Sequence, residues 1–166
     1  MREQLTENDV KKIREEIQYR KLVVRKEAIE AVKEARSHGD LSENFEYYAA
    51  KKDKNKNEGR IRYLERMIHN ARIISDESRE DEVGLNTIVE LFFEEDELLE
   101  TFKLVTSVRG NSINGMISIE SPIGKAILGH RVNDRVKVKV FDDDGYYIII
   151  RAVKKADDTK DQIRLF

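Results

Sequence analysis

The stretch HGDLSENFEY, residues 38–47, separates two long segments that are rich in charged, helix-forming residues. Residues 1–80 contain no proline, and glycine occurs there only at Gly39 and Gly59. Gly39 can adopt a left-handed conformation at the end of a first helix. Two long helices joined by a tight turn must run antiparallel, so this stretch predicts a helical hairpin. Its turn gathers three carboxylates, Asp40, Glu43 and Glu46.

Each predicted helix has one narrow apolar seam. Thr6 and Asp9 resemble a capping box, so the first helix should begin near Asn8. Its apolar residues alternate at spacings of three and four, with a polar gap around Arg20: Val10, Ile13, Ile17, Val24, Ala28, Ala31 and Ala35. The second helix carries Phe45, Tyr48 and Ala49 early, and Ile61, Leu64, Ile68 and Ala71 late. Two such seams predict an antiparallel coiled coil, in which the polar stretch 51–60 stays helical because it connects the two parts of the second seam.

The second half of the chain has the composition of a sheet. Runs rich in β-branched and aromatic residues predict strands at 87–93, 102–108, 115–121, 136–141 and 146–153. The sequence FDDDGY predicts a hairpin turn at Asp144-Gly145. A short helix should cover residues 122–128. The expected class is α+β: a helical coiled-coil hairpin followed by a small antiparallel β-sheet domain with a short helix.

Composition sets the domain boundaries and excludes several classes of protein. The hairpin should cover residues 1–78, the sheet domain 79–156 and a charged tail 157–166, with a polar linker at 75–86. The chain has no cysteine, which excludes disulfides, thiolate metal sites and a thiol nucleophile. Its three histidines are scattered, and no run of 18 apolar residues or signal-like N-terminus occurs. A cytoplasmic protein without membrane contact is expected.

Charge within the helical half is sorted along the chain. Residues 40–46 hold three acids and no base, whereas residues 51–66 hold seven bases and three acids. This pattern suits a metal ion that lies beside a nucleic-acid strand. Two simpler interpretations stay open: Asp40 and Glu43 as helix-capping residues, and the basic flank as a solvated face. Tyr47 and Tyr48 are assigned to core and rim packing rather than to base stacking.

Three motifs in order resemble those of the bacterial Gre transcript cleavage factors of the GreA type. They are GDLSENFEYYAAK (39–51), NEGRI (57–61) and SPIGKAILG (121–129), and LT (5–6) and EAR (34–36) agree as well. The resemblance covers about residues 5–153. It implies an N-terminal coiled coil and a C-terminal FKBP-like domain that docks at the rim of the secondary channel of RNA polymerase.

The resemblance also implies a mechanism. The coiled coil enters the channel, and its acidic tip (residues 39–46) reaches the polymerase active centre. Asp40 and Glu43 there help to bind a magnesium ion shared with the polymerase, which then hydrolyses backtracked RNA. No cofactor is expected to bind stably to the chain alone. Ser42 and Glu46 are secondary candidates, because Ser42 lies between the acids and Glu46 is one turn further along.

The remaining site assignments are looser. Lys51, Lys52 and Lys54 should lie near the 3′ segment of the nascent RNA. Glu120, Ser121 and Pro122 match the family segment linked to docking on the polymerase.

The sequence departs from the family pattern at the tip and leaves other functions open. Family members usually have alanine where Phe45 stands, which leaves room for a paralogue that binds the channel and inhibits or modulates polymerase without cleavage. A prolyl isomerase is disfavoured, because it needs an aromatic, apolar pocket and the aromatic residues of the predicted sheet are assigned mostly to core or surface. A free-standing nuclease is equally disfavoured, because carboxylates on a tip lack the preorganisation that metal ligands need. The expected protein is a monomer and is not itself an enzyme.

Overall fold

The computed structural model describes residues 2–39 and 44–165, and these form two compact units. One unit is the helical part, residues 8–71, and the other combines residues 3–7 with residues 72–165. Each unit is described by itself below. None of the helices in residues 2–39 and 44–165 has the length and apolar character needed to span a bilayer.

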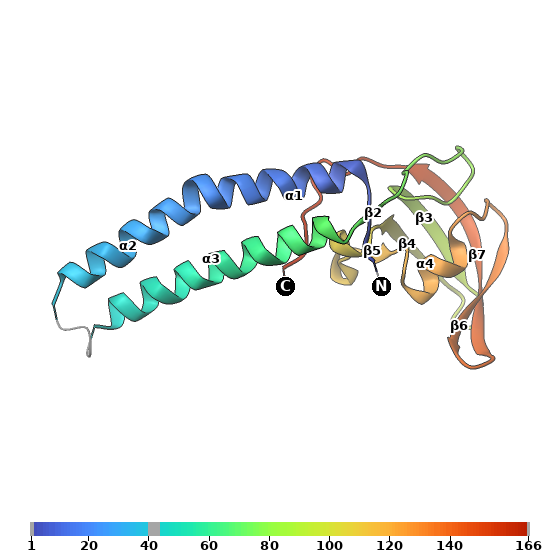
Figure 1. Cartoon of the computed structure of the whole chain (residues 1–166). Coiled ribbons are helices and arrows are strands. Elements are labelled where there is room, and N and C mark those ends of the chain that lie inside the picture. Colours follow the sequence, from blue (N-terminus) through green and yellow to red (C-terminus); the bar gives the residue numbers. More distant parts are fainter. Residues whose placement is uncertain (1, 40–43, 166) are drawn as a thin grey trace. The chain divides into compact units, whose positions relative to one another are not determined.

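The helical unit is the predicted antiparallel hairpin. Its first arm consists of α1 (Glu7–Tyr19), a π-helical segment η1 (Arg20–Val24) and α2 (Arg25–Ser37), and its second arm is the continuous α3 (Phe45–His69). The two arms lie side by side (Figure 1). Residues 51–60 are helical as expected, within α3.

The seam of α3 differs from the prediction in its first turns. The late residues Ile61 and Leu64 are buried, as expected. Further towards the tip the less exposed positions are Tyr47, Ala50, Lys54 and Asn57, which continue the spacing of three and four. Phe45, Tyr48 and Ala49 are therefore wrongly assigned to the seam, because all three side chains are exposed. On the first arm, Ala31 is likewise exposed and Val32 is half-buried.

The other unit is built on a five-stranded sheet with the strand order β5-β4-β3-β7-β6. The strands are β3 (Thr87–Phe93), β4 (Leu98–Val105), β5 (Met116–Ser118), β6 (Arg135–Phe141) and β7 (Asp144–Lys155). The short helix α4 (Pro122–Ile127) is present as predicted. A separate two-stranded parallel sheet joins β1 (Gln4–Leu5) to β2 (Arg72–Ile73). This architecture confirms the α+β class.

The five-stranded sheet is mixed rather than wholly antiparallel. Strand β5 pairs in parallel with β4, whereas the other three pairings are antiparallel. The predicted strand 102–108 ends at Val105, and two short 3-10 helices, η2 (Ser107–Arg109) and η3 (Ser112–Asn114), follow it. These turns carry the chain back as far as Lys103, so that β5 can run alongside the last three residues of β4 in the same direction.

The hairpin between β6 and β7 turns earlier than the sequence suggested. The turn residues are Asp142 and Asp143, and Asp142 has a φ of +46°. Gly145 lies within β7, where an added Cβ would stand 2.2 Å from the carbonyl oxygen of Val138. Glycine is therefore needed there for close approach of the two strands and not for the turn.

One face of the sheet supports the core of this unit. Alternate residues of β3 and β7 are buried, and Val136 and Val138 of β6 join them, together with Ile127 of α4. Val140, two residues further along β6, is half exposed because the register shifts between Lys139 and Phe141. The alternation of buried and exposed residues in β6 thus ends at this irregularity.

The charged tail is attached to the sheet unit by ion pairs. The Asp161 carboxylate accepts hydrogen bonds from Lys103 Nζ at 2.9 Å and from Arg109 Nη1 at 2.7 Å. Arg109 is 1% exposed and also donates to Asn86 Oδ1 at 2.7 Å. Because a buried guanidinium is costly without a partner, Asp161 makes the tail part of this unit.

Candidate functional site

The second arm begins at a side-chain cap next to the acidic tip. Asn44 is the N-cap of α3, and its Oδ1 accepts a hydrogen bond from the backbone N–H of Tyr47 at 3.0 Å. Its Nδ2 donates to the carbonyl oxygen of Ala35 on the first arm at 2.6 Å. Asn44 thus satisfies a free amide of α3 and ties the two arms together at the tip.

The first arm ends as the sequence predicted. His38 is the C-cap of α2, and Gly39 has a φ of +123°, a positive value that favours glycine. His38 Nδ1 lies 3.0 Å from Glu46 Oε2. Of the four tip residues proposed from the sequence, the structure describes only Glu46, and it places this carboxylate against His38. Asp40, Ser42 and Glu43 lie outside the described residues.

Tyr47 is held in place by an arginine from the first arm. The Arg36 guanidinium lies 5.4 Å from the centre of the Tyr47 ring, and its Nη2 donates to the Tyr47 hydroxyl at 3.4 Å. This hydrogen bond, together with the positive charge of Arg36, lowers the pKa of the Tyr47 hydroxyl from its ordinary value. The contact is a second bridge between the arms beside the tip.

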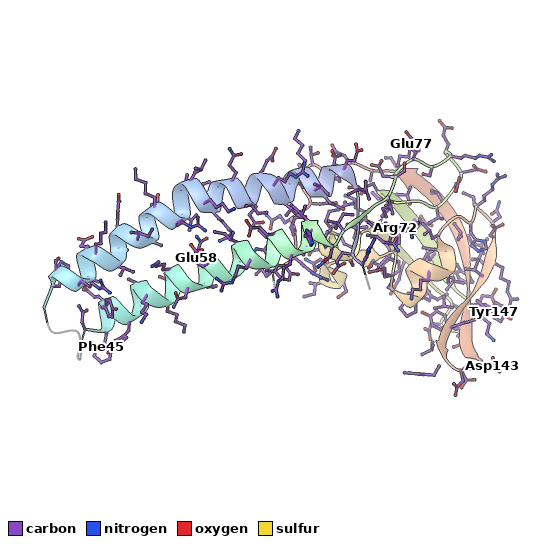
Figure 2. All side chains as sticks on the ribbon, viewed as in Figure 1. Phe45, Glu58, Arg72, Glu77, Asp143 and Tyr147 are labelled. Carbon is purple, nitrogen blue, oxygen red and sulfur yellow. The ribbon has the colours of Figure 1, made fainter. Side chains whose placement is uncertain are left out.

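Two aromatic side chains near the tip face solvent instead of the seam. Phe45 is 85% exposed and Tyr48 is 53% exposed. Phe45 is the first residue of α3, next to the tip acids in sequence (Figure 2). The Tyr48 ring packs edge-on against Tyr47, with their centres 5.6 Å apart. The spacing of apolar residues in the sequence predicted both residues in the seam, and their exposure shows that this assignment was wrong.

The basic flank continues along α3 beyond these rings. Lys51 and Lys52 are exposed, and Lys54 is half-buried on the seam side. Among the described residues, no ion pair involves any of these three lysines. Lys51 and Lys52 thus present exposed positive charges on this part of α3, whereas the charge of Lys54 acts on Glu58 and Tyr47.

The middle of the hairpin contains a cluster of buried and half-buried polar side chains that was not predicted from the sequence. Glu16 on α1 accepts hydrogen bonds from Arg60 Nε and Arg20 Nε, each at 2.9 Å. Arg20 Nη1 donates to Asn57 Oδ1 at 3.0 Å, and both Asn57 and Arg60 are buried. We call Glu16, Arg20, Asn57 and Arg60 the polar layer.

The polar layer determines the charge state of Glu16. Burial raises the pKa of Glu16, but hydrogen bonds from Arg60 and Arg20 and their positive charges outweigh this, so the net shift is downward. Glu16 is therefore ionised at neutral pH. The polar gap around Arg20 and the polar residues 57 and 60 between apolar seam positions were the signal in the sequence for this cluster.

A further ion pair joins the two arms beside the polar layer. Arg25 donates to both oxygens of Glu58, at 2.7 and 2.9 Å, and this lowers the pKa of Glu58 (Figure 2). Arg25 follows the π-helical segment, where its N–H donates to the carbonyl oxygen of Arg20, five residues back. The π-helical segment thus begins at Arg20 of the polar layer and leads into α2, the tip-side part of the first arm.

The proposed docking segment has a clear local structure. Ser121 is the N-cap of α4: its Oγ accepts from the N–H of Gly124 at 3.0 Å and donates to the carbonyl oxygen of Ser118 at 2.6 Å. Pro122 occupies the first turn and is exposed, while Glu120 is half-buried. The three residues lie together at the start of α4. Their part in binding a partner stays a prediction.

Comparison with protein families accounts for both units. Residues 3–73 match the family described as "Transcription elongation factor, N-terminal", and residues 77–154 match "Transcription elongation factor, GreA/GreB, C-term". The chain belongs to the GreA/GreB family of transcription elongation factors. The match spans the hairpin, the polar layer, the basic flank and the docking segment.

Individual GreA relatives agree over most of the chain. The transcription elongation factor GreA of Caldanaerobacter subterraneus subsp. tengcongensis is 43% identical over 137 residues, covering 82% of this chain and 87% of that protein. The GreA of Bacillus licheniformis is 42% identical over 151 residues, covering 90% and 94%. A solved structure of the transcription factor Gfh1 is 26% identical and covers 92% of this chain and 97% of that chain, with a TM-score of 0.46. Membership in the GreA/GreB family rests on the sequence matches.

Proposed function

We propose that this chain is a transcription elongation factor that enters the secondary channel of RNA polymerase and stimulates cleavage of backtracked RNA. The observation that carries the proposal is the position of Asp40 and Glu43. In the sequence they fall between α2 and α3, which belong to the two antiparallel arms, and the chain matches GreA relatives through both halves.

The two units have separate tasks in this proposal. The sheet unit docks at the rim of the channel through Glu120, Ser121 and Pro122. The hairpin extends into the channel and brings the tip to the active centre, where Lys51, Lys52 and Lys54 lie close to the 3′ segment of the nascent RNA. The cross-arm contacts of Asn44 and Arg36 support this role, because they hold the two arms together near the tip.

The donor chemistry of the tip fits a magnesium ion. Carboxylate oxygens are ligands that Mg²⁺ prefers, and it is usually bound by one or two protein carboxylates with other ligands from its surroundings. Asp40 and Glu43 would provide these oxygens, and the polymerase would provide the rest. When bound, the ion supplies positive charge that activates water and offsets charge developing on the phosphodiester. Residues 2–39 and 44–165 include no group of three potential ligands placed to hold a metal.

The chain itself is not proposed to be an enzyme. The polymerase performs the hydrolysis, and this protein places carboxylates where the polymerase alone has too few. On this proposal the protein acts as a monomer in the bacterial cytoplasm. Because neutral pH is well above the ordinary pKa of a carboxyl group, the tip acids need no special environment to act as ligands.

The test uses a stalled, backtracked elongation complex of the polymerase from the same organism, with labelled RNA and Mg²⁺. Wild-type protein is compared with the double variant Asp40→Ala/Glu43→Ala. The matched control is Glu95→Ala/Asp96→Ala, which removes two exposed acids from the turn between β3 and β4. Binding of all three proteins to the complex is measured separately.

The expected result is rapid release of short 3′ fragments with the wild type and the control, and loss of at least about a hundredfold in rate with the double variant. Binding without fragments from the wild type would contradict the proposal. A protein that occupies the channel without cleavage would then be the better account.

A further inference from the structure

The first turns of α3 present an exposed aromatic face that the hairpin does not use. The seam positions of this part of α3 are Tyr47, Ala50 and Lys54. Phe45 and Tyr48 are three residues apart and lie on another side of the helix, where they are 85% and 53% exposed. Single exposed apolar residues are common on protein surfaces, but a pair of aromatic rings at the end of a long hairpin is a defined surface.

Lysines extend this face away from the tip. Lys52 follows Tyr48 by four residues and Phe45 by seven, so the three side chains share one stripe of the helix. Lys51 is next to them, and both lysines are exposed. We call Phe45, Tyr48, Lys51 and Lys52 the tip face.

One of the two rings is already held in position. Tyr48 packs edge-on against Tyr47, with 5.6 Å between ring centres and an angle of 63° between the ring planes. Tyr47 is in turn fixed by the guanidinium of Arg36 on the first arm. A supported ring loses less conformational freedom when it binds a flat partner, so the outer side of Tyr48 is preorganised for stacking.

Exposed rings followed by exposed lysines are the combination that binds single-stranded nucleic acid without sequence preference. Bases stack on the rings, and the positive charges contact the phosphates. We propose that the tip face binds the unpaired 3′ segment of backtracked RNA: Phe45 and Tyr48 stack on its bases, and Lys51 and Lys52 contact its backbone. This inference rests on the proposed function, which places the tip beside that segment. The lysines favour RNA over an apolar protein surface as the partner, since an apolar surface has no negative groups to pair with their positive charges.

The experiment is a double-mutant cycle between the protein rings and the RNA bases. Backtracked complexes are prepared with two RNAs, one with normal bases and one with abasic nucleotides in the displaced 3′ segment. Cleavage is measured at limiting factor concentration with the wild type, Phe45→Ala/Tyr48→Ala and Phe45→Trp/Tyr48→Trp. Phe141→Ala is the matched control, because Phe141 is 80% exposed but lies on the sheet unit.

A second readout does not depend on cleavage. The RNA carries 4-thiouridine at its 3′ end, and photo-cross-linking to the protein is measured on the same complexes. Circular dichroism establishes that each variant keeps its helical content.

With normal RNA, the alanine variant should cleave about tenfold more slowly than the wild type, while the tryptophan variant and Phe141→Ala keep the wild-type rate. With abasic RNA, the wild type and the alanine variant should cleave equally. Equal slowing of the alanine variant on both RNAs would overturn the proposal, because the rings would then serve a protein contact or the shape of the tip.

The two proposals fail in different ways. If the wild type does not stimulate cleavage at all, the proposed function is wrong. Photo-cross-linking then tests by itself whether the tip face binds RNA. A cross-link that the alanine variant loses supports stacking even then, whereas equal cross-linking by both proteins overturns it.

Discussion

The middle and the tip of the same hairpin use polar and aromatic residues in opposite ways. In the middle, Glu16 accepts a hydrogen bond from the buried Arg60, and the buried Asn57 accepts one from Arg20. At the tip, Phe45 is turned outward, and in the sequence the acids Asp40 and Glu43 come shortly before it. The comparison teaches that charge alone does not identify the working end of such a helix pair. The degree of burial distinguishes the two groups: buried charged side chains bond to the other arm, whereas exposed side chains can contact a partner molecule.

The polar layer should be the most sensitive part of the hairpin. Replacing Arg60 by alanine leaves Glu16 partly buried with one cationic partner fewer, and the expected cost is about 2–4 kcal/mol of local stability. The measurement is hydrogen exchange of the α3 amides. Lys21→Ala is the matched control, since it breaks an exposed ion pair with Glu65 that is worth less than about 1 kcal/mol. Equal losses in the two variants would remove the distinction between the middle of the hairpin and its surface.

The tail of the sheet unit provides the same contrast away from the hairpin. Asp161→Asn should destabilise this unit by about 1–3 kcal/mol, because the buried Arg109 loses its ionised partner. Asp143→Asn, in the exposed turn between β6 and β7, should have little effect. Hydrogen exchange of β3 and β4 reports the difference. If the two variants behave alike, the tail is not part of this unit.

The stability of the polar layer should depend on pH through Glu16. The pKa of Glu16 in the folded protein lies below its ordinary value of 4.5, so its contribution is fully present above that value. The contribution is lost as the pH falls through the lowered folded pKa. The wild type should therefore be more stable than Glu16→Gln near neutral pH, and the two should converge as the pH falls below 4.5. Parallel pH profiles would show that Glu16 is not the group responsible.

The smallest expected effect is at the N-cap of α3. Asn44→Ala removes both the cap on Tyr47 and the bond to Ala35, and should cost about 1 kcal/mol in the first turn of the helix. Asn44→Asp can still accept from the Tyr47 amide but cannot donate to Ala35. Exchange of the Tyr47 and Tyr48 amides separates the two contributions. Full protection in the alanine variant would show that the cap is not needed at the tip.

The sequence was a good guide where one pattern decides the structure. Strong helix formers on either side of Gly39 predicted the hairpin, and β-branched runs predicted most of the sheet. The short helix predicted at residues 122–128 is present as α4, where Ser121 provides its cap. In each of these segments local preference and tertiary packing agree.

The errors occurred where packing decides between local alternatives. Phe45 looks like a seam residue, but the heptad spacing that runs back from Leu64 and Ile61 selects Tyr47 instead. The parallel pairing of β5 depends on how residues 106–115 fold back, which no alternation pattern encodes. The turn between β6 and β7 formed at Asp142-Asp143, because the glycine expected there is needed where the strands approach closely.

The candidate site was predicted in the same uneven way. The three tip acids and the basic flank could be found from charge sorting and from the resemblance to Gre factors. The polar layer was not predicted, because isolated polar residues in a helical sequence do not reveal their partners on another arm. The exposure of Phe45 and Tyr48 required the helix to be placed in its correct rotation.

The central claim is that Asp40 and Glu43 act through a magnesium ion shared with the polymerase. The most direct test measures the cleavage rate of a backtracked complex as a function of Mg²⁺ concentration, with the wild type and with Asp40→Asn/Glu43→Gln, which keeps the side-chain size and removes both charges. The account predicts that the variant needs about tenfold or more additional Mg²⁺ to approach the wild-type rate, because fewer charged oxygens bind the ion. The same Mg²⁺ dependence for both proteins would contradict it.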